Sequence, residues 1–309
     1  MMVSAKLQPF LADVNKAIAQ AKADNIAFSA EVVRVNLDKL GALVTTTPQV
    51  ANITDTTVQG VPVRVYLPKT ELEPAPEKAN DLSVLIYFHG GGHMCGSVQL
   101  YDPMCRKIAS ATGCIVISVE YRLAPEHPYP AGIDDAQLVV ENYAEVLDGL
   151  NAGSELIIAG DSAGGAICTT LAMNNQHNRA VNIDKQILIY PSVDYTMSHP
   201  SVAQNGKGFL LESDKVAWYF DSYFQHGEDR KSVSPLFGLI TSQLPKTLVV
   251  TAGCDPLRDE GLAYVAALKQ QAVPVQHEHF DDMVHAFMNI EDLVPEECQR
   301  LFEIIGGFV

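Results

Sequence analysis

A glycine-rich stretch, GDSAGG at residues 160–165, constrains the fold of this chain more than any other feature. It follows an apolar run at 156–159 that predicts a strand and precedes a segment at 166–173 that predicts a helix. A serine on a sharp strand-to-helix turn, with a glycine two residues to either side, is typical of a nucleophile elbow. Such a turn lifts Ser162 Oγ above the sheet edge, at the positive end of the following helix. The alternative, a glycine-rich turn without chemistry, is weaker in this context.

A second glycine-rich stretch, HGGG at 89–92, follows the run 82–88, which predicts a buried strand. Consecutive glycines let backbone N–H groups turn toward one point, because no Cβ restricts φ. Lipases and esterases use such a loop as part of an oxyanion hole, together with the N–H of the residue after the nucleophile, here Ala163. A flexible loop is the alternative, but the order of the two motifs favours the oxyanion hole.

A nucleophilic serine needs a base, which an acid in turn orients, and in α/β-hydrolases the chain order is serine, acid, histidine. The segment 247–253 predicts a strand, and Asp255 lies just past its end. Pro256 then begins a helix, whose turn directs Asp259 and Glu260 elsewhere. Asp255 is therefore the predicted acid.

The predicted base is His285, which follows the strand expected at 273–280 and a short loop expected at 281–284. His277 and His279 alternate along that strand and so share one face. They suggest either a metal site or, more simply, the polar face of an edge strand. The remaining histidines after the serine are predicted to lie on the surface: His177, His199 and His226.

Four motifs in this order resemble those of the bacterial hormone-sensitive-lipase-like carboxylesterases, a family with the α/β-hydrolase fold. They are HGGG at 89–92, YRLAPE at 121–126, GDSAGG at 160–165 and DPLRDEG at 255–261. The aspartate before the serine resembles the subfamily written GDSAG. The resemblance runs from about residue 55 to the last residue.

This resemblance implies that Ser162, Asp255 and His285 are nucleophile, acid and base. It also implies that Gly91 and Gly92 join Ala163 as oxyanion donors, and that the YRLAPE segment holds the loops around the site. The chain departs from the family's pattern at His93, where an aromatic or bulky apolar residue is usual, and around His285, which is followed by alanine instead of glycine. His93 either lines the acyl pocket or contacts solvent at the loop edge.

The remaining segments alternate between predicted helices and strands, with a helix predicted at 131–149, and this alternation indicates a mostly parallel sheet with helices on both faces. We expect an α/β-hydrolase fold with eight strands and a helical cap. The expected units are cap helices at 1–45, a catalytic domain at 46–193 and 236–309, and a cap insertion at 194–235. A hairpin or surface loop is expected at 71–81. The candidate substrate-binding residues are His93, Phe209, Leu210 and Trp218.

The composition narrows the possible partners. A net charge of −16 and a pI near 4.8 argue against nucleic acid, anionic membranes and strongly acidic substrates. No apolar run has the length of a signal peptide or a transmembrane helix, so we expect a soluble, cytoplasmic protein. Six scattered cysteines without a Cys-x-x-Cys pair suit reduced thiols. A homodimer through the C-terminal edge strand and the helix at 296–308 is possible, though nothing in the sequence requires it.

These observations predict a serine carboxylesterase that hydrolyses short- to medium-chain acyl esters through an acyl-enzyme, with no metal and no organic cofactor. The partner is then a small-molecule ester. The same triad would also serve an amide or formamide hydrolase or a metabolite deacetylase, because the sequence does not reveal the leaving atom. A non-catalytic ligand-binding relative is the remote alternative, and the presence of His285 argues against it.

Overall fold

The structure of the chain is a computed structural model and describes residues 2–69, 81–178 and 181–309. Most of the loop expected at 71–81 lies outside these residues. Within them, eight strands form one sheet in the order β1-β2-β4-β3-β5-β6-β7-β8. The pairs β1–β2 and β2–β4 are antiparallel and the other neighbours are parallel, so the expected mostly parallel sheet is confirmed. The strands are β1 (Asn52–Val58), β2 (Val61–Leu67), β3 (Leu82–Phe88), β4 (Ile115–Val119), β5 (Ala152–Asp161), β6 (Lys185–Ile189), β7 (Lys246–Cys254) and β8 (Val275–Val284).

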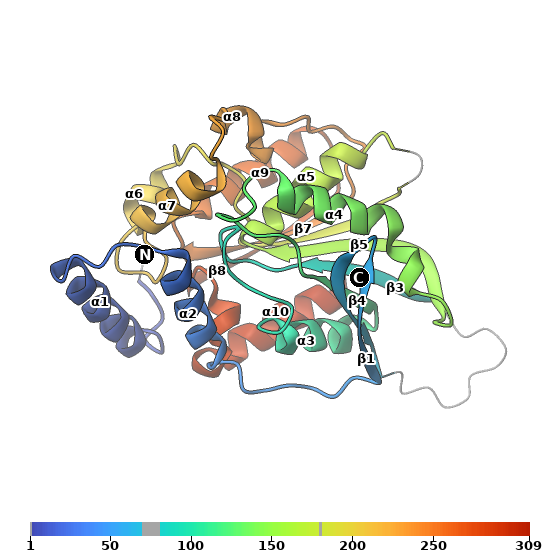
Figure 1. Cartoon of the computed structure of the whole chain (residues 1–309), viewed down its shortest axis with the longest axis horizontal. Helices are drawn as coiled ribbons and strands as arrows, with labels where there is room; N and C mark the ends of the chain where they lie inside the picture. Colours follow the sequence, from blue (N-terminus) through green and yellow to red (C-terminus); the bar gives the residue numbers. More distant parts are fainter. Residues whose placement is uncertain (1, 70–80, 179–180) are drawn as a thin grey trace.

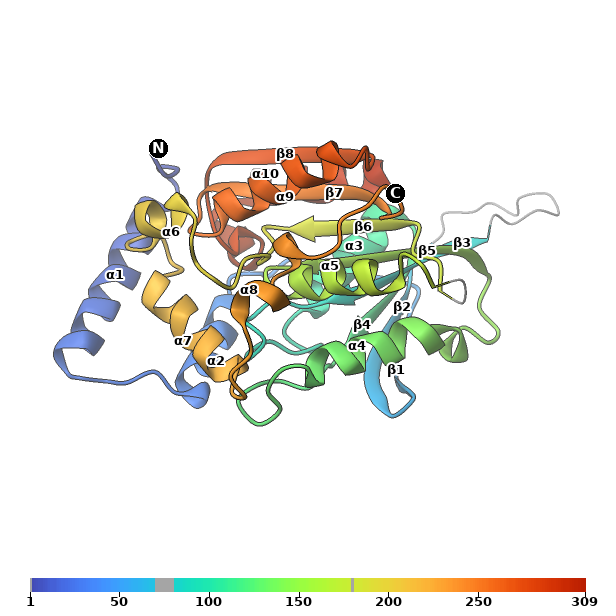
Figure 2. The same ribbon diagram turned by 90° about the horizontal axis from the view of Figure 1, so that it is seen from above.

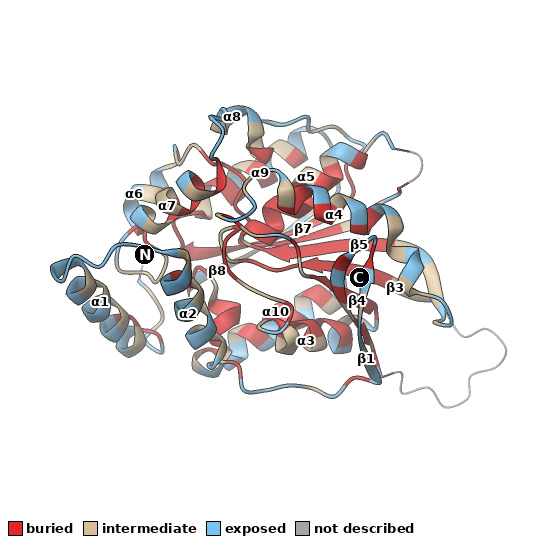
Figure 3. Ribbon diagram, viewed as in Figure 1, coloured by how far each residue is buried: buried red, intermediate tan, exposed pale blue. Residues whose placement is uncertain are grey.

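Helices cover both faces of this sheet, and their outer surfaces carry the exposed residues (Figures 1 and 3). The α-helices are α1 (Gln8–Ala23), α2 (Ala30–Gly41), α3 (Asp102–Thr112), α4 (Ala131–Asn142), α5 (Ala163–Asn175), α6 (Pro200–Asn205), α7 (Ser213–Tyr223), α8 (Arg230–Val233), α9 (Arg258–Gln270) and α10 (Pro295–Phe308). Short 3-10 helices are η1 (Tyr143–Val146), η2 (Pro235–Phe237) and η3 (Phe287–Leu293).

The central strand β3 shows why the core has two layers. Its side chains alternate between the two faces of the sheet, and both faces are buried. Leu85 and Tyr87 belong to the apolar cluster that includes α3 and α10. Val84, Ile86 and Phe88 belong to the cluster that includes α4, α5 and α9. A strand covered on both sides must be apolar at nearly every position, which is the pattern of the run 82–88.

Two expected element boundaries are wrong. The helix expected at 131–149 ends at Asn142, where η1 follows. The loop expected at 281–284 is instead the last part of β8, whose pairing with β7 shifts register between Ala252 and Cys254. Gly253 permits this irregularity, because a Cβ at this position would lie 1.8 Å from the Asp281 carbonyl oxygen. His285 therefore follows directly on a strand.

Helices from two distant parts of the chain gather at one end of the sheet, where Figure 2 shows α1, α2, α6 and α7 together. On the polar side, Lys22 of α1 pairs with Glu212 at 2.8 Å, and Asn15 donates to the Gly208 carbonyl at 3.2 Å. A third apolar cluster joins α2 and α7 to the loops that follow β3 and β4. The N-terminal helices and the 194–235 segment thus pack as neighbours over the same strand ends.

The six cysteines are all buried and carry free thiols. No helix among the described residues is both long and apolar enough to cross a membrane.

Candidate active site

Ser162 lies at the turn between β5, which ends at Asp161, and α5, which begins at Ala163. Its backbone has φ 52° and ψ −115°, a conformation that costs free energy in a residue with a Cβ. The Ser162 N–H donates to the Ile189 carbonyl at 2.9 Å, and its own carbonyl accepts from Ser192 N–H at 3.0 Å. The end of β6 and the loop that follows it therefore hold the strained turn on both sides.

The turn is tight because β5 and α5 approach each other without side chains between them. A Cβ on Gly164 would lie 1.9 Å from the Phe88 carbonyl oxygen, and one on Gly160 would lie 2.4 Å from the Gly164 carbonyl carbon. Neither contact is possible for any residue other than glycine without moving the backbone. The two glycines of the motif are thus required by close approach of the chain.

The predicted acid and base meet the serine in one chain of hydrogen bonds. His285 Nε2 lies 2.9 Å from Ser162 Oγ, and His285 Nδ1 lies 2.8 Å from Asp255 Oδ2. The three residues directly follow β5, β7 and β8, whose parallel carboxyl ends meet at the same edge of the sheet. Asp255 and His285 are 1% and 5% exposed, so water competes little for these bonds. The arrangement is that of a serine nucleophile, its base and the acid that orients the base.

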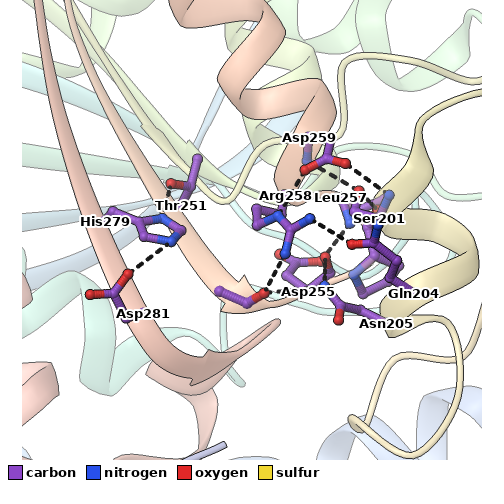
Figure 4. A network of polar contacts seen from close by, with 12 residues as sticks. Ser201, Gln204, Asn205, Thr251, Asp255, Leu257, Arg258, Asp259, His279 and Asp281 are labelled. Atoms are coloured by element: carbon purple, nitrogen blue, oxygen red, sulfur yellow. Dashed lines mark hydrogen bonds and ion pairs between the residues drawn. The ribbon is translucent and has the colours of Figure 1, made fainter. Parts of the chain in front are cut away.

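Helix α6 of the 194–235 segment holds the loop that carries Asp255 (Figure 4). Asn205 donates to the carbonyls of Gly253 and Asp255, at 3.1 and 3.0 Å. Ser201 Oγ donates to the Pro256 carbonyl at 2.7 Å, and the Leu257 N–H donates to Asp255 Oδ1 at 2.8 Å. Asp255 therefore accepts a backbone hydrogen bond of its own loop with Oδ1 and faces His285 with Oδ2. No local sequence pattern singles out Asn205, because its partners lie about 50 residues further along the chain.

The predicted oxyanion donors lie around the same point. Gly91, Gly92 and Ala163 line one cavity with Ser162, and their N–H groups donate to no acceptor within the described part of the chain. Gly92 has φ 63°, and a Cβ there would lie 2.6 Å from the Tyr219 ring. Free N–H donors beside a nucleophile can stabilise negative charge as it develops on a carbonyl oxygen.

Asp161 ties the HGGG loop to the nucleophile turn. Its Oδ1 accepts hydrogen bonds from Tyr87 OH and from the Gly90 N–H, both at 2.7 Å, and its Oδ2 accepts from Tyr101 OH at 3.1 Å. Burial raises the pKa of Asp161, while these donors act in the opposite direction. Because Asp161 is the residue before Ser162, the two halves of the site are joined through one carboxyl.

His89 and His93, at the two ends of the HGGG loop, are buried, and each ring stacks on a tyrosine ring. Tyr121 OH, from the YRLAPE segment, donates to the His89 carbonyl at 2.7 Å, and the two rings stack with centroids 4.5 Å apart. His93 stacks on Tyr223 of α7 with centroids 4.0 Å apart, and its Nε2 lies 3.3 Å from Tyr195 OH. Burial lowers the pKa of His89 to about 4 and that of His93 to about 3, so both rings are neutral at pH 7.

The cavity beside Ser162 is mostly apolar and is roofed by α2 and α7. His93 and Leu210, two of the predicted substrate-binding residues, line it. Phe209 and Trp218 are not among the described lining residues: Trp218 contacts Phe28, with ring centroids 5.5 Å apart, and Phe209 packs against the core. Side chains that the sequence did not single out also line it, among them Leu37, Leu40, Lys215 and Tyr219.

The other histidines occupy different surroundings. His277 Nε2 lies 2.8 Å from Thr251 Oγ1. His279 Nδ1 lies 2.7 Å from the same oxygen, and its Nε2 lies 3.3 Å from Asp281 (Figure 4). Among the described residues, no group of three or more His, Cys, Asp and Glu is arranged to hold a metal ion. His177 and His226 are exposed, as expected. The surface position expected for His199 is wrong, since it is half-buried with Nε2 3.5 Å from Asp194.

Known proteins are similar to this chain in sequence and in fold. A family model described as alpha/beta hydrolase fold matches residues 85–289. The chain belongs to this family. The ethyl acetate hydrolase of Pseudomonas putida is 36% identical over 252 residues, which cover 79% of this chain and 77% of that protein. A carboxylesterase of Mycobacterium tuberculosis is 36% identical over 249 residues, which cover 77% of this chain and 75% of that protein.

A solved structure extends the likeness to nearly the whole chain. The hyperthermophilic esterase from the archaeon Pyrobaculum calidifontis superposes with a TM-score of 0.85 at 31% identity, covering 99% of this chain and 97% of that one. The expected place of this α/β-hydrolase among the hormone-sensitive-lipase-like enzymes is therefore confirmed. Its assignment to the GDSAG subfamily stays a prediction.

Proposed function

We propose that this α/β-hydrolase is a serine carboxylesterase that cleaves short- to medium-chain acyl esters. The observation that carries the proposal is the continuous chain of hydrogen bonds from Asp255 through His285 to Ser162, which lies at an apolar cavity. The esterases among its relatives act on the bond for which such a site is suited.

The geometry supports the following sequence of steps. Ser162 Oγ attacks the ester carbonyl carbon while His285 Nε2 takes the hydroxyl proton, and Asp255 holds the imidazole tautomer. The carbonyl oxygen becomes an oxyanion, which accepts hydrogen bonds from the loop glycines and Ala163; one such donor contributes roughly 10²–10³ in rate. His285 then protonates the leaving alcohol. Water, activated by His285, releases the acid from the acyl-enzyme and returns the proton to Ser162.

We also propose that residues 1–45 and 194–235 act together as the cap of a catalytic domain formed by 46–193 and 236–309. Both segments contribute to the roof of the cavity, through Leu37 and Leu40 of α2 and through Val216 and Tyr219 of α7. An apolar roof excludes water and accepts an acyl chain. The cytoplasmic location and the homodimer expected from the sequence remain predictions.

Hydrolysis of p-nitrophenyl esters with two to sixteen acyl carbons tests the activity, and Ser162→Ala tests the nucleophile. We expect activity to peak at short to medium chains and to fall to background in the variant, a loss on the order of 10⁶-fold. Ser118→Ala is the matched control, since Ser118 is fully buried in β4 and does not line the cavity.

A chemical label separates the nucleophile from the choice of substrate. A fluorophosphonate should modify Ser162 in the wild-type protein, as shown by mass spectrometry of the peptides. Cleavage of p-nitroanilides with no cleavage of any ester would favour the amide hydrolase instead. Retained ester hydrolysis in Ser162→Ala would refute the assignment of the nucleophile.

A further inference from the structure

Among the described residues, Lys215 is the lysine or arginine that lines the mostly apolar substrate cavity. Lys215 of α7 lines this cavity together with Ser162 and His285. The helical face that it shares with Val216, Tyr219 and Phe220 points into the protein, and the other three residues are buried. A lysine at helical spacing on such a face takes a position that an apolar residue would fill at lower cost.

Among the described residues, no carboxylate pairs with the Lys215 ammonium. Within the described part of the chain it makes no ion pair and no side-chain hydrogen bond, and its charge lies 5.6 Å from the centroid of the Tyr219 ring. Glu212, one turn earlier, is engaged by Lys22 at 2.8 Å. Cys95 nearby is a buried thiol whose pKa is raised by burial, so it stays neutral and supplies no counter-charge.

A positive charge at this position is unfavourable for the stability of the fold. Lys215 is the third residue of α7, and the N-terminal turn of a helix disfavours positive charge. Burial also lowers the pKa of Lys215, because the charged form is held away from water. The other charged group of the wall, Asp161, is already bonded to two hydroxyls and one N–H. A ligand that brings a negative charge to Lys215 would remove the cost of an unpaired, half-buried ammonium.

We propose that Lys215 binds a carboxylate of the substrate, so that the preferred ester carries an anionic group on its acyl or its alcohol portion. The inference rests on the proposed esterase function and specifies its substrate class. A charge-assisted hydrogen bond in a site shielded from water contributes roughly ten- to hundredfold in affinity. The ammonium would act as a specificity group and takes no part in bond breaking.

Matched pairs of esters test the proposal, each pair differing only in charge. For the acyl side, the p-nitrophenyl monoester of adipic acid is compared with the corresponding adipamate, whose terminal carboxamide is neutral. For the alcohol side, p-(butyryloxy)benzoate is compared with p-(butyryloxy)benzamide. We expect kcat/KM for the anionic member of one pair to exceed that of the neutral member by about tenfold or more. The pair that shows the preference identifies the portion that Lys215 contacts.

Substitutions then assign the preference to Lys215. Lys215→Met keeps the unbranched chain up to the ε position and removes the ammonium, so the anionic-to-neutral ratio should fall about tenfold, whereas Lys215→Arg should retain it. The ratio is taken within one variant, so a change in the fraction of active protein cancels. Lys207→Met is the control, because Lys207 is an exposed lysine of the same segment that does not line the cavity.

The outcomes separate the two proposals. Robust hydrolysis of the neutral esters with no preference in either pair would overturn the role of Lys215 and leave the esterase intact. An unchanged ratio in Lys215→Met would overturn it as well. If Lys215→Met does not fold, the wild-type ratio and the Lys215→Arg ratio still decide. Failure to hydrolyse any ester of the series would refute the esterase proposal itself.

Discussion

The two buried histidines at the ends of the HGGG loop should make the folded protein less stable in mild acid. His93 is 2% exposed and its pKa is lowered to about 3, mainly by burial. His89 is fully buried and its pKa is lowered to about 4, again mainly by burial. The unfolded chain binds a proton at each of these residues near pH 6.5, but the folded protein does not. Stability from these groups is therefore complete above about pH 6.5 and is lost as the pH falls toward their folded pKa values.

The size of the effect follows from the pH interval. At pH values between the folded and the unfolded pKa, each unit by which the pH falls lowers the unfolding free energy by about 1.4 kcal/mol per histidine. Between pH 7.5 and 5.5, His93 should thus cost about 1.4 kcal/mol of unfolding free energy, and His89 a similar amount. His93→Phe removes the first contribution while keeping an aromatic ring on Tyr223, against which His93 stacks at 4.0 Å.

Urea unfolding at pH 7.5 and pH 5.5 measures this difference. The wild type should lose about 1.4 kcal/mol more than His93→Phe over the interval. The loss of the Tyr195 contact shifts the stability of the variant at both pH values and so leaves the difference unaffected. His226→Gln, at an exposed histidine, is the control and should follow the wild type. Equal pH-dependent losses in the wild type and His93→Phe would refute the argument.

Three further substitutions test how the site is held. Gly164→Ala places a Cβ 1.9 Å from a backbone oxygen and should lower the unfolding free energy by about 1–3 kcal/mol in urea titrations; an unchanged midpoint would contradict the close packing. Asn205→Ala removes two hydrogen bonds from the loop that carries Asp255, so kcat should fall about tenfold with little change in KM. A change in KM alone would contradict a positioning role for Asn205. Tyr101→Phe removes one donor from Asp161 and should cost about 1.5 kcal/mol in the same unfolding assay; no loss would mean that the bond contributes nothing.

The parts of the molecule that the sequence predicts well are those that local chain geometry determines. The two glycine-rich stretches each follow a buried strand, and the residues predicted as nucleophile, acid and base follow β5, β7 and β8 in chain order. Parallel strands bring these positions to one edge of the sheet. Sequence alone therefore identified three side chains that hydrogen-bond to one another across separations of 123 and 30 residues.

What the sequence did not reveal depends on contacts between distant segments. His93 is buried because Tyr223 and Tyr195 of another segment pack over it. Trp218 is a predicted substrate-binding residue, but α7 turns it toward Phe28 instead. The extension of β8 depends on one glycine in the neighbouring strand, which accepts a backbone oxygen where a Cβ would stand. No local pattern contains this information.

The net charge of −16 and the cation at Lys215 act over different ranges, which resolves an apparent conflict. Acidic residues on the surface lie in water and salt, where charges further apart than about 8–10 Å are largely screened. They slow the approach of an anion and favour neutral or cationic ligands at a distance. The wall of the cavity is mostly apolar, so water screens charges there less than it does at the surface. The Lys215 ammonium, which is unpaired among the described residues, therefore acts more strongly on a ligand that has already entered. The expectation that acidic substrates are disfavoured therefore applies to association, while the choice between bound esters depends on contact with Lys215.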